Sequence, residues 1–159
     1  MPSQQELDIT YLRMARVWSG LSKAARKQVG CLIVKDCTII SDGYNGTPSG
    51  FDNVCEWKRQ IGSYPIDTPA DKREYSLETK REVLHAESNA ISKLAKSTQS
   101  SHAATIYITC APCFDCSKLI IQCGICRVVY GEEYRDREGI ILLEKASIKT
   151  DHLSETRTQ

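Results

Sequence analysis

Two short segments far apart in the chain constrain its fold most strongly, because their side chains form a metal-binding set only if they meet. The first is His85-Ala86-Glu87 and the second is Pro112-Cys113-Phe114-Asp115-Cys116. Together they offer one imidazole and two thiols, which are preferred zinc ligands. Structural zinc sites fill all four positions with protein, whereas catalytic sites use three and leave the fourth for water. We therefore predict a catalytic site in which His85, Cys113 and Cys116 hold one Zn²⁺ ion.

Both segments are predicted to begin helices. Residues 86–95 carry apolar side chains at helical spacing, which places Glu87 in a first turn. Pro112 is favoured at the first position of a helix and would put Cys113 and Cys116 on one helical face. The positive end of a helix dipole favours the thiolate form that metals bind. Two helix starts are thus expected to meet at one metal.

Glu87 is the predicted catalytic residue of this site. Zinc lowers the pKa of a bound water from about 15.7 to about 7, so that hydroxide forms at neutral pH. A neighbouring carboxylate can carry the protons of a hydrolytic reaction if its pKa lies near neutrality, as burial would bring about. The alternative is an ordinary interior histidine with a structural or redox Cys-x-x-Cys pair. The occurrence of both halves in this order argues against it and matches the signature of zinc-dependent base deaminases.

Length and charge agree with one enzyme domain. The chain has 159 residues and a formal net charge of +1, which gives no basic surface for long nucleic acid. We find neither a secretory signal nor a run of membrane-spanning length, so we expect a cytoplasmic protein without a membrane partner. In that compartment the eight cysteines are expected as metal ligands and buried thiols rather than as disulfides.

The order of apolar segments predicts an α/β fold. A first helix with Leu12, Ala15 and Trp18 facing the core precedes two strands, 29–34 and 38–41, whose short connection favours an antiparallel hairpin. Further strands then alternate with helices, which requires parallel pairing. These later elements are expected at residues 105–109, 112–121, 128–130 and 140–145. The result is a mixed sheet sandwiched by helices.

We expect one domain over residues 1–150 and a polar tail at 151–159. The segment at about 45–83 is dense in charge and interrupted by Gly and Pro, so we predict a long functional loop with short helical pieces.

Three segments resemble the deoxycytidylate deaminases, and in particular their phage-like forms. They are 43–50 (GYNGTPSG), 85–91 (HAESNAI) and 109–121 (TCAPCFDCSKLII). The zinc motif is shared with cytidine, guanine and tRNA adenosine deaminases, whereas the Gly-Tyr-Asn-Gly-Thr-Pro run is more selective and points to the deoxynucleotide branch. The resemblance implies a three-layer α/β/α sandwich with a central mixed five-stranded sheet.

The resemblance also implies an activity and its regulation. The reaction is conversion of dCMP to dUMP and ammonia, which supplies thymidylate synthesis. Glu87 would pass a proton from water to ring nitrogen 3 and then to the leaving amino group. The implied protein is a homo-oligomer, commonly a hexamer, activated by dCTP, with Mg²⁺ accompanying this effector, and inhibited by dTTP. Some phage relatives hold a second, structural zinc, but Cys55 here has no neighbouring histidine pair.

Substrate contacts are predicted at five residues. Asn45 has an amide suited to a deoxyribose hydroxyl, although Asn-Gly is also a turn signal. Arg26 is the first choice for the 5′-phosphate because guanidinium binds phosphate bidentately, with Lys23 and Lys27 as alternatives. Tyr134 is expected to stack on or hydrogen-bond to the nucleotide. The remaining candidates are two hydroxyl donors to phosphate, Thr47 and Ser49.

Effector binding is assigned by resemblance to residues 47–59, with Asn53, Glu56 and Lys58 as unranked candidates. Three other functions stay open. A deaminase that also accepts dCTP would share the base chemistry, a tRNA adenosine deaminase would need a basic face, and a non-enzymatic structural zinc module would not need Glu87.

Overall fold

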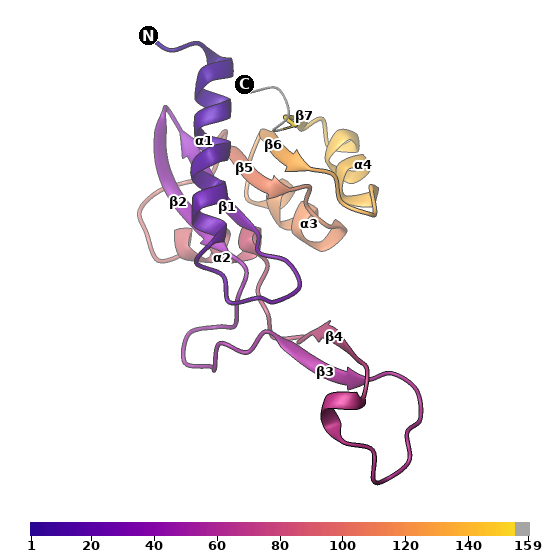
Figure 1. The fold of residues 1–159 in the computed structure, drawn as a ribbon. Helices are drawn as coiled ribbons and strands as arrows, with labels where there is room; N and C mark the ends of the chain where they lie inside the picture. The colour runs from indigo at the N-terminus through magenta and orange to yellow at the C-terminus, as the bar shows by residue number, and fades with distance from the viewer. Residues whose placement is uncertain (155–159) are drawn as a thin grey trace.

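The computed structural model describes residues 1–154 and is organised around a mixed five-stranded sheet with strand order β2-β1-β5-β6-β7 (Figure 1). β1 pairs antiparallel with β2 and β5, whereas β5–β6 and β6–β7 are parallel. The predicted hairpin and the predicted parallel pairing are therefore confirmed. The strands are β1 Gly30–Lys35, β2 Thr38–Tyr44, β5 Thr105–Cys110, β6 Arg127–Glu132 and β7 Lys149–His152.

Helices cover both faces of this sheet. One face packs on α1 and the other on α2, α3 and α4. β1 shows the division, because Leu32 and Val34 join the cluster under α1 while Cys31 and Ile33 join the cluster on the opposite face. The predicted three-layer α/β/α sandwich is confirmed. The helices are α1 Gln4–Ser19, α2 Ala86–Leu94, α3 Phe114–Gln122 and α4 Glu138–Lys145.

The prediction that Trp18 belongs to the core is wrong. Leu12 and Ala15 are buried, but Trp18 is 36% exposed. It lies in the last turn of α1, and its indole N–H donates to Asp42 Oδ1 of the edge strand β2 at 2.7 Å. A ring whose N–H must meet a carboxylate at the sheet edge remains partly in solvent.

The segment at 45–83 contains a β-hairpin arm that projects from the body (Figure 1). The arm consists of β3 Glu56–Gln60, a short 3₁₀ helix η1 at Ala70–Lys72 and β4 Tyr75–Thr79, with β3 and β4 antiparallel. The expected short helical piece is present, but the two strands were missed. Most side chains on both faces of the hairpin are exposed, so its sequence lacks the alternation that marks a half-buried strand.

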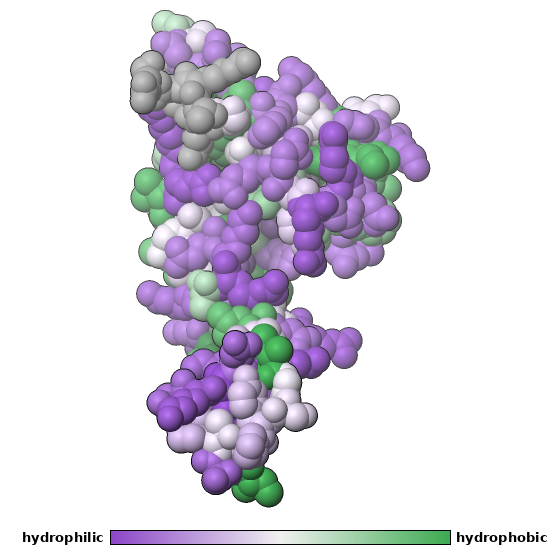
Figure 2. Space-filling model, turned by 45° about the vertical axis from the view of Figure 1, so that its right-hand side comes forward, coloured by the Kyte–Doolittle hydropathy of each residue, from purple (hydrophilic) through white to green (hydrophobic). Residues whose placement is uncertain are grey.

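Apolar side chains are exposed along this arm and beside its base. Figure 2 shows apolar surface at the base and at the tip of the projecting part. The residues concerned are Phe51, Val54, Trp57, Ile61, Ile66, Tyr75 and Leu77.

The predicted boundary at residue 150 falls inside a strand. Asp151 and His152 belong to β7 and pair with Val129 and Tyr130 of β6. The end of the expected tail, 155–159, lies outside the described residues. Within residues 1–154, no helix combines the length and the apolar character needed to cross a membrane.

A buried ion pair ties α1 to the sheet. The two terminal nitrogens of the Arg127 guanidinium, Nη1 and Nη2, donate to the Asp8 carboxylate at 2.8 and 2.7 Å. Its third nitrogen, Nε, donates to Asp151. Tyr107 and Gln4 donate to the same Asp8 oxygen. Burial acts to raise the pKa of Asp8, but the hydrogen bonds from Arg127, Tyr107 and Gln4 outweigh it and hold that pKa below its usual value. The network therefore favours the ionised carboxylate.

We predict that Asp8→Asn lowers the free energy of unfolding by about 3 kcal/mol at pH 7, because it leaves a buried guanidinium short of its partner. Because the pKa of Asp8 is lower in the folded protein than in the unfolded chain, where it is about 3.9, the ionised carboxylate stabilises the fold at pH values above about 3.9. This contribution is lost as the pH falls through the pKa of Asp8 in the folded protein. The difference between wild type and variant should thus shrink below about pH 4. Denaturant unfolding across pH tests this, with the exposed Asp67→Asn as control. Equal stabilities at pH 7 would contradict the assignment.

Candidate active site

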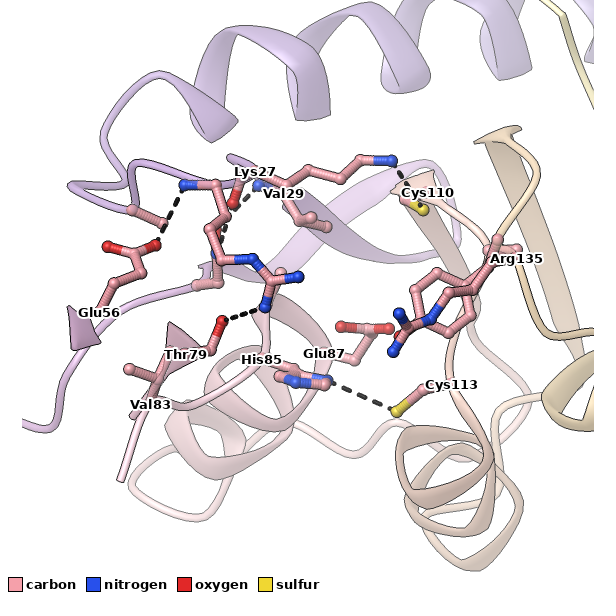
Figure 3. Close-up of a pocket in the computed structure, with 16 residues that line it drawn as sticks. Lys27, Val29, Glu56, Thr79, Val83, His85, Glu87, Cys110, Cys113 and Arg135 are labelled. Carbon is pink, nitrogen blue, oxygen red and sulfur yellow. Dashed lines mark hydrogen bonds between the residues drawn. The ribbon is translucent and has the colours of Figure 1, made fainter. Parts of the chain in front are cut away.

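The predicted zinc ligands converge at two helix N-termini. His85 is the N-cap residue of α2, Cys113 is the N-cap residue of α3, and Cys116 lies in the first turn of α3. His85 Nδ1 is 3.5 Å from Cys113 Sγ and 3.4 Å from Cys116 Sγ. Pro112 precedes the N-cap instead of occupying the first helical position. Figure 3 shows His85 and Cys113 facing each other across the pocket.

Both cap positions lack the usual capping contact. Neither His85 nor Cys113 makes a side-chain capping hydrogen bond. Replacing a good capping residue in this way costs about 1 kcal/mol per helix. The side chains instead point toward one another, which is the arrangement a shared metal requires.

Close packing against β2 positions the start of α2. A Cβ atom added at Gly43 would lie only 2.1 Å from the carbonyl oxygen of Ala86, so a larger residue would displace the first turn. Ser41 Oγ donates to the Ala90 carbonyl at 2.7 Å, and Asn89 Nδ2 donates to the Tyr44 carbonyl at 2.9 Å. Gly43, the first glycine of the GYNGTP run, thus allows the close packing that positions the start of α2 and with it His85 of the metal-binding set.

The chemistry of this donor set fits zinc. The three ligand atoms lie within 4.8 Å of one another, and in the described part of the chain no fourth His, Cys, Asp or Glu donor joins them. A hydrogen bond from Cys116 lowers the pKa of Cys113 to about 4, and contact with that thiolate, together with burial, raises the pKa of Cys116. A bound divalent cation would offset the repulsion between two thiolates. Three soft ligands with an open position are typical of a catalytic zinc site.

Glu87 lies in the first turn of α2 and lines the same pocket. It is only 4% exposed, and burial raises the pKa of its carboxyl to about 7. A carboxyl with this pKa can both accept and donate a proton near neutral pH. The expected tuning by burial therefore has a structural basis.

The pocket encloses about 250 Å³, near the lower end for small-molecule sites. In Figure 3 Thr79 and Glu56 lie on the side opposite Cys113 and Arg135, with His85 and Glu87 between them. The arm thus supplies one wall of the pocket through Glu56 and Thr79.

Three cationic side chains line the pocket, namely Arg26, Lys27 and Arg135. Lys27 Nζ forms an ion pair with Glu132 Oε2 at 2.9 Å and donates to Cys110 Sγ at 3.3 Å. Its ammonium group is therefore already held at Glu132, a carboxylate that also pairs with Arg16, which favours Arg26 among the phosphate candidates. The third candidate, Lys23, does not line the cavity. Arg135 was missed, although its position just beyond the carboxyl end of β6 is where ligand sites of α/β sheets collect.

Asn45 lines the pocket, but its amide also supports the backbone. Its Oδ1 accepts from the Val29 N–H at 2.8 Å, and its Nδ2 donates to the Lys27 carbonyl at 2.8 Å. One amide hydrogen and one lone pair remain for a ligand. The two interpretations from sequence, a structural residue and a ligand contact, are therefore compatible.

The other candidates divide between the pocket and the surface. Tyr134 and Glu56 line the cavity. Thr47, Ser49, Asn53 and Lys58 do not, and the Thr47 hydroxyl donates instead to the Asp52 carbonyl. Glu56, which sequence reasoning assigned to an effector site, thus belongs to the wall of the active-site pocket.

Comparisons with known proteins identify the family. The model of the cytidine and deoxycytidylate deaminase zinc-binding region matches residues 5–132. The chain therefore belongs to the family of zinc-dependent cytidine and deoxycytidylate deaminases. The resemblance inferred from the three sequence segments is confirmed.

Named relatives point to one branch of this family. The chain is 35% identical over 150 residues to the deoxycytidylate deaminase of Saccharomyces cerevisiae, with 94% of this chain and 45% of the yeast protein covered. It is 33% identical to the deoxycytidylate deaminase of Enterobacteria phage T4, with 79% and 77% covered. The chain thus spans less than half the length of the yeast relative.

A solved structure supports the same grouping. The dCMP deaminase of cyanophage S-TIM5, in complex with dCMP and dUMP, is 35% identical and superimposes with a TM-score of 0.79. The match covers 96% of this chain and 100% of the cyanophage chain.

We predict that Cys113→Ala lowers the zinc content of the purified protein far below one ion per chain, because two remaining ligands hold the ion too weakly. Metal analysis after dialysis against a mild chelator measures this. Cys126→Ala is the control and should keep its zinc. Cys126 belongs to a second Cys-x-x-Cys sequence, residues 123–126, between α3 and β6. Stoichiometric zinc in Cys113→Ala would contradict the ligand assignment.

Proposed function

We propose that this protein hydrolytically deaminates dCMP to dUMP and ammonia. The observation that carries the proposal is the presence, in one pocket, of a three-ligand metal set, a buried carboxyl with a pKa near 7, and two guanidinium groups, those of Arg26 and Arg135. The first two suit attack of water on a base, and the third suits a phosphate. Relatives named deoxycytidylate deaminase and a neighbour with bound dCMP and dUMP support this substrate.

Glu87 performs the proton transfers in this proposal. Zinc, when bound by His85, Cys113 and Cys116, would supply an activated water as nucleophile. Glu87 accepts the proton that this water releases and delivers it to cytosine N3, which makes carbon 4 electrophilic. The water oxygen bonds to carbon 4 as the C4=N3 double bond of the ring becomes single. Glu87 then takes the second proton from this oxygen and gives it to the amino group, so that the C4–N bond to that group breaks and ammonia leaves as the C4=O bond forms. The raised pKa of Glu87 lets one group serve both steps.

Arg26 and Arg135 bind the 5′-phosphate in this proposal. A guanidinium binds phosphate through paired N–H donors. The guanidinium of Arg26 is already oriented, because its Nη1 donates a hydrogen bond to the Thr79 hydroxyl. Asn45 contacts the deoxyribose hydroxyl through its remaining hydrogen-bonding capacity. Tyr134 lies beside Arg135, whose guanidinium is 5.8 Å from the ring, and flanks the nucleotide.

The proposed function also includes assembly into an oligomer and regulation by nucleotides. We propose a cytoplasmic homo-oligomer, a hexamer by family resemblance, which supplies dUMP for thymidylate synthesis and responds to dCTP, with Mg²⁺, as activator and to dTTP as inhibitor. The seven exposed apolar residues on and beside the arm support assembly, because a two-stranded hairpin without a packing partner is marginally stable in water.

We predict that the purified protein consumes dCMP, and that Glu87→Gln reduces kcat by at least about 10²-fold while zinc stays bound. The loss of cytosine absorbance is followed with dCMP, CMP, cytidine and dCTP as substrates, and repeated with dCTP or dTTP added to dCMP. Exposed Glu144→Gln is the matched control.

Full turnover in Glu87→Gln would contradict the mechanism, and turnover of a tRNA hairpin but not of dCMP would contradict the substrate. Hyperbolic kinetics unaffected by dCTP would contradict the effector site.

A further inference from the structure

The base of the β-hairpin arm touches the segment that carries Arg26. Glu56 is the first residue of β3, Thr79 is the last residue of β4, and the two are paired across the hairpin. Both line the pocket, on the side away from Cys113 (Figure 3). The chemistry proposed above uses neither as a reacting group.

Glu56 holds the main chain at Arg26. Its Oε1 accepts the backbone N–H groups of Ala25, at 3.0 Å, and of Arg26, at 3.1 Å. A free carboxylate in this wall would repel an anionic ligand. The two hydrogen bonds offset part of the Glu56 charge and fix the main chain of the loop at Ala25 and Arg26.

Thr79 holds the side chain of the same residue. Its Oγ1 accepts a hydrogen bond from Arg26 Nη1 at 3.2 Å. A guanidinium has five N–H donors, so this contact leaves four for a ligand. Glu56 and Thr79 therefore restrain one arginine at both its main chain and its tip.

The base of the arm is closed by contacts of its own. The Lys80 N–H donates to the Cys55 carbonyl at 2.9 Å, which closes the hairpin just below the Glu56–Thr79 pair. The Lys80 side chain is buried, lies 4.6 Å from the centre of the Trp57 ring and pairs with Asp52 at 3.5 Å. The two contacts to Arg26 thus come from the part of the arm where Lys80 joins its two strands.

We propose that Glu56 and Thr79 are positioning residues that hold Arg26 in place for the phosphate of the nucleotide, so that the arm takes part in substrate binding. This inference rests on the proposed function. An unrestrained arginine loses side-chain entropy when it binds a ligand, and a restraint already present in the free protein removes part of that cost. The restraint acts on ligands that carry a phosphate and leaves the deamination step unchanged.

The test is a double-mutant cycle that combines Thr79→Val with Arg26→Ala, assayed on dCMP and on deoxycytidine, which lacks the phosphate. Thr79→Val should raise KM for dCMP about fivefold, as expected for loss of one hydrogen bond, with kcat unchanged. Its kcat/KM for deoxycytidine should equal that of wild type. In the Arg26→Ala background Thr79→Val should have no further effect, because its role passes through Arg26.

Conservative and control variants separate positioning from general damage. Thr79→Ser keeps the hydroxyl and should restore the KM of wild type, and Glu56→Ala should raise KM for dCMP only while Arg26 is present. Thr68→Val, in the outer part of the arm, should change neither constant.

Three results would overturn the proposal or its basis. An unchanged KM for dCMP in Thr79→Val, with normal wild-type turnover, contradicts the positioning role alone. An equal effect in the Arg26→Ala background shows direct contact with substrate instead. A wild-type protein that deaminates neither substrate contradicts the proposed function itself.

Discussion

The meeting of two helix N-termini is the constraint on which the rest of this structure depends. His85 and Cys113 occupy the N-cap positions of α2 and α3, and the space between them is set by the sheet on which both helices pack. β2 approaches α2 so closely that only glycine is accommodated at Gly43. Neither residue makes a side-chain capping hydrogen bond, and both side chains instead face each other at the metal-binding set. The same helix start also buries Glu87 beside the metal-binding set, and burial brings its pKa to about 7.

In the proposed function, substrate recognition depends on parts of the chain that the sandwich does not contain. The loop before β1 carries Arg26, the segment after β6 carries Arg135, and the arm contributes Glu56 and Thr79. Under this proposal the sandwich supplies the metal-binding set and Glu87, while peripheral segments bind the group attached to the base. Neighbouring cations in this pocket have different partners, because Lys27 pairs with Glu132 whereas Arg26 donates to the Thr79 hydroxyl.

The elements of the fold that depend on neighbouring residues in the chain could be predicted from sequence. The helix starts, the hairpin of β1 and β2 and the parallel strands follow from apolar periodicity and from short connections. The restraint on Arg26 could not be predicted, because Thr79 is 53 residues away and its hydroxyl resembles any other on an exposed strand. The strands of the arm escaped detection because both faces are exposed, and Trp18 was misplaced because helical spacing does not show where a helix passes the sheet edge.

The central claim is that three protein ligands hold the metal and leave one position open. X-ray absorption at the zinc edge of the purified protein measures this directly. The account predicts two sulfur ligands at about 2.3 Å and two lighter ligands at about 2.0–2.1 Å, of which one is an imidazole and the other a water. A third sulfur or a second imidazole would show a closed structural site and would contradict it.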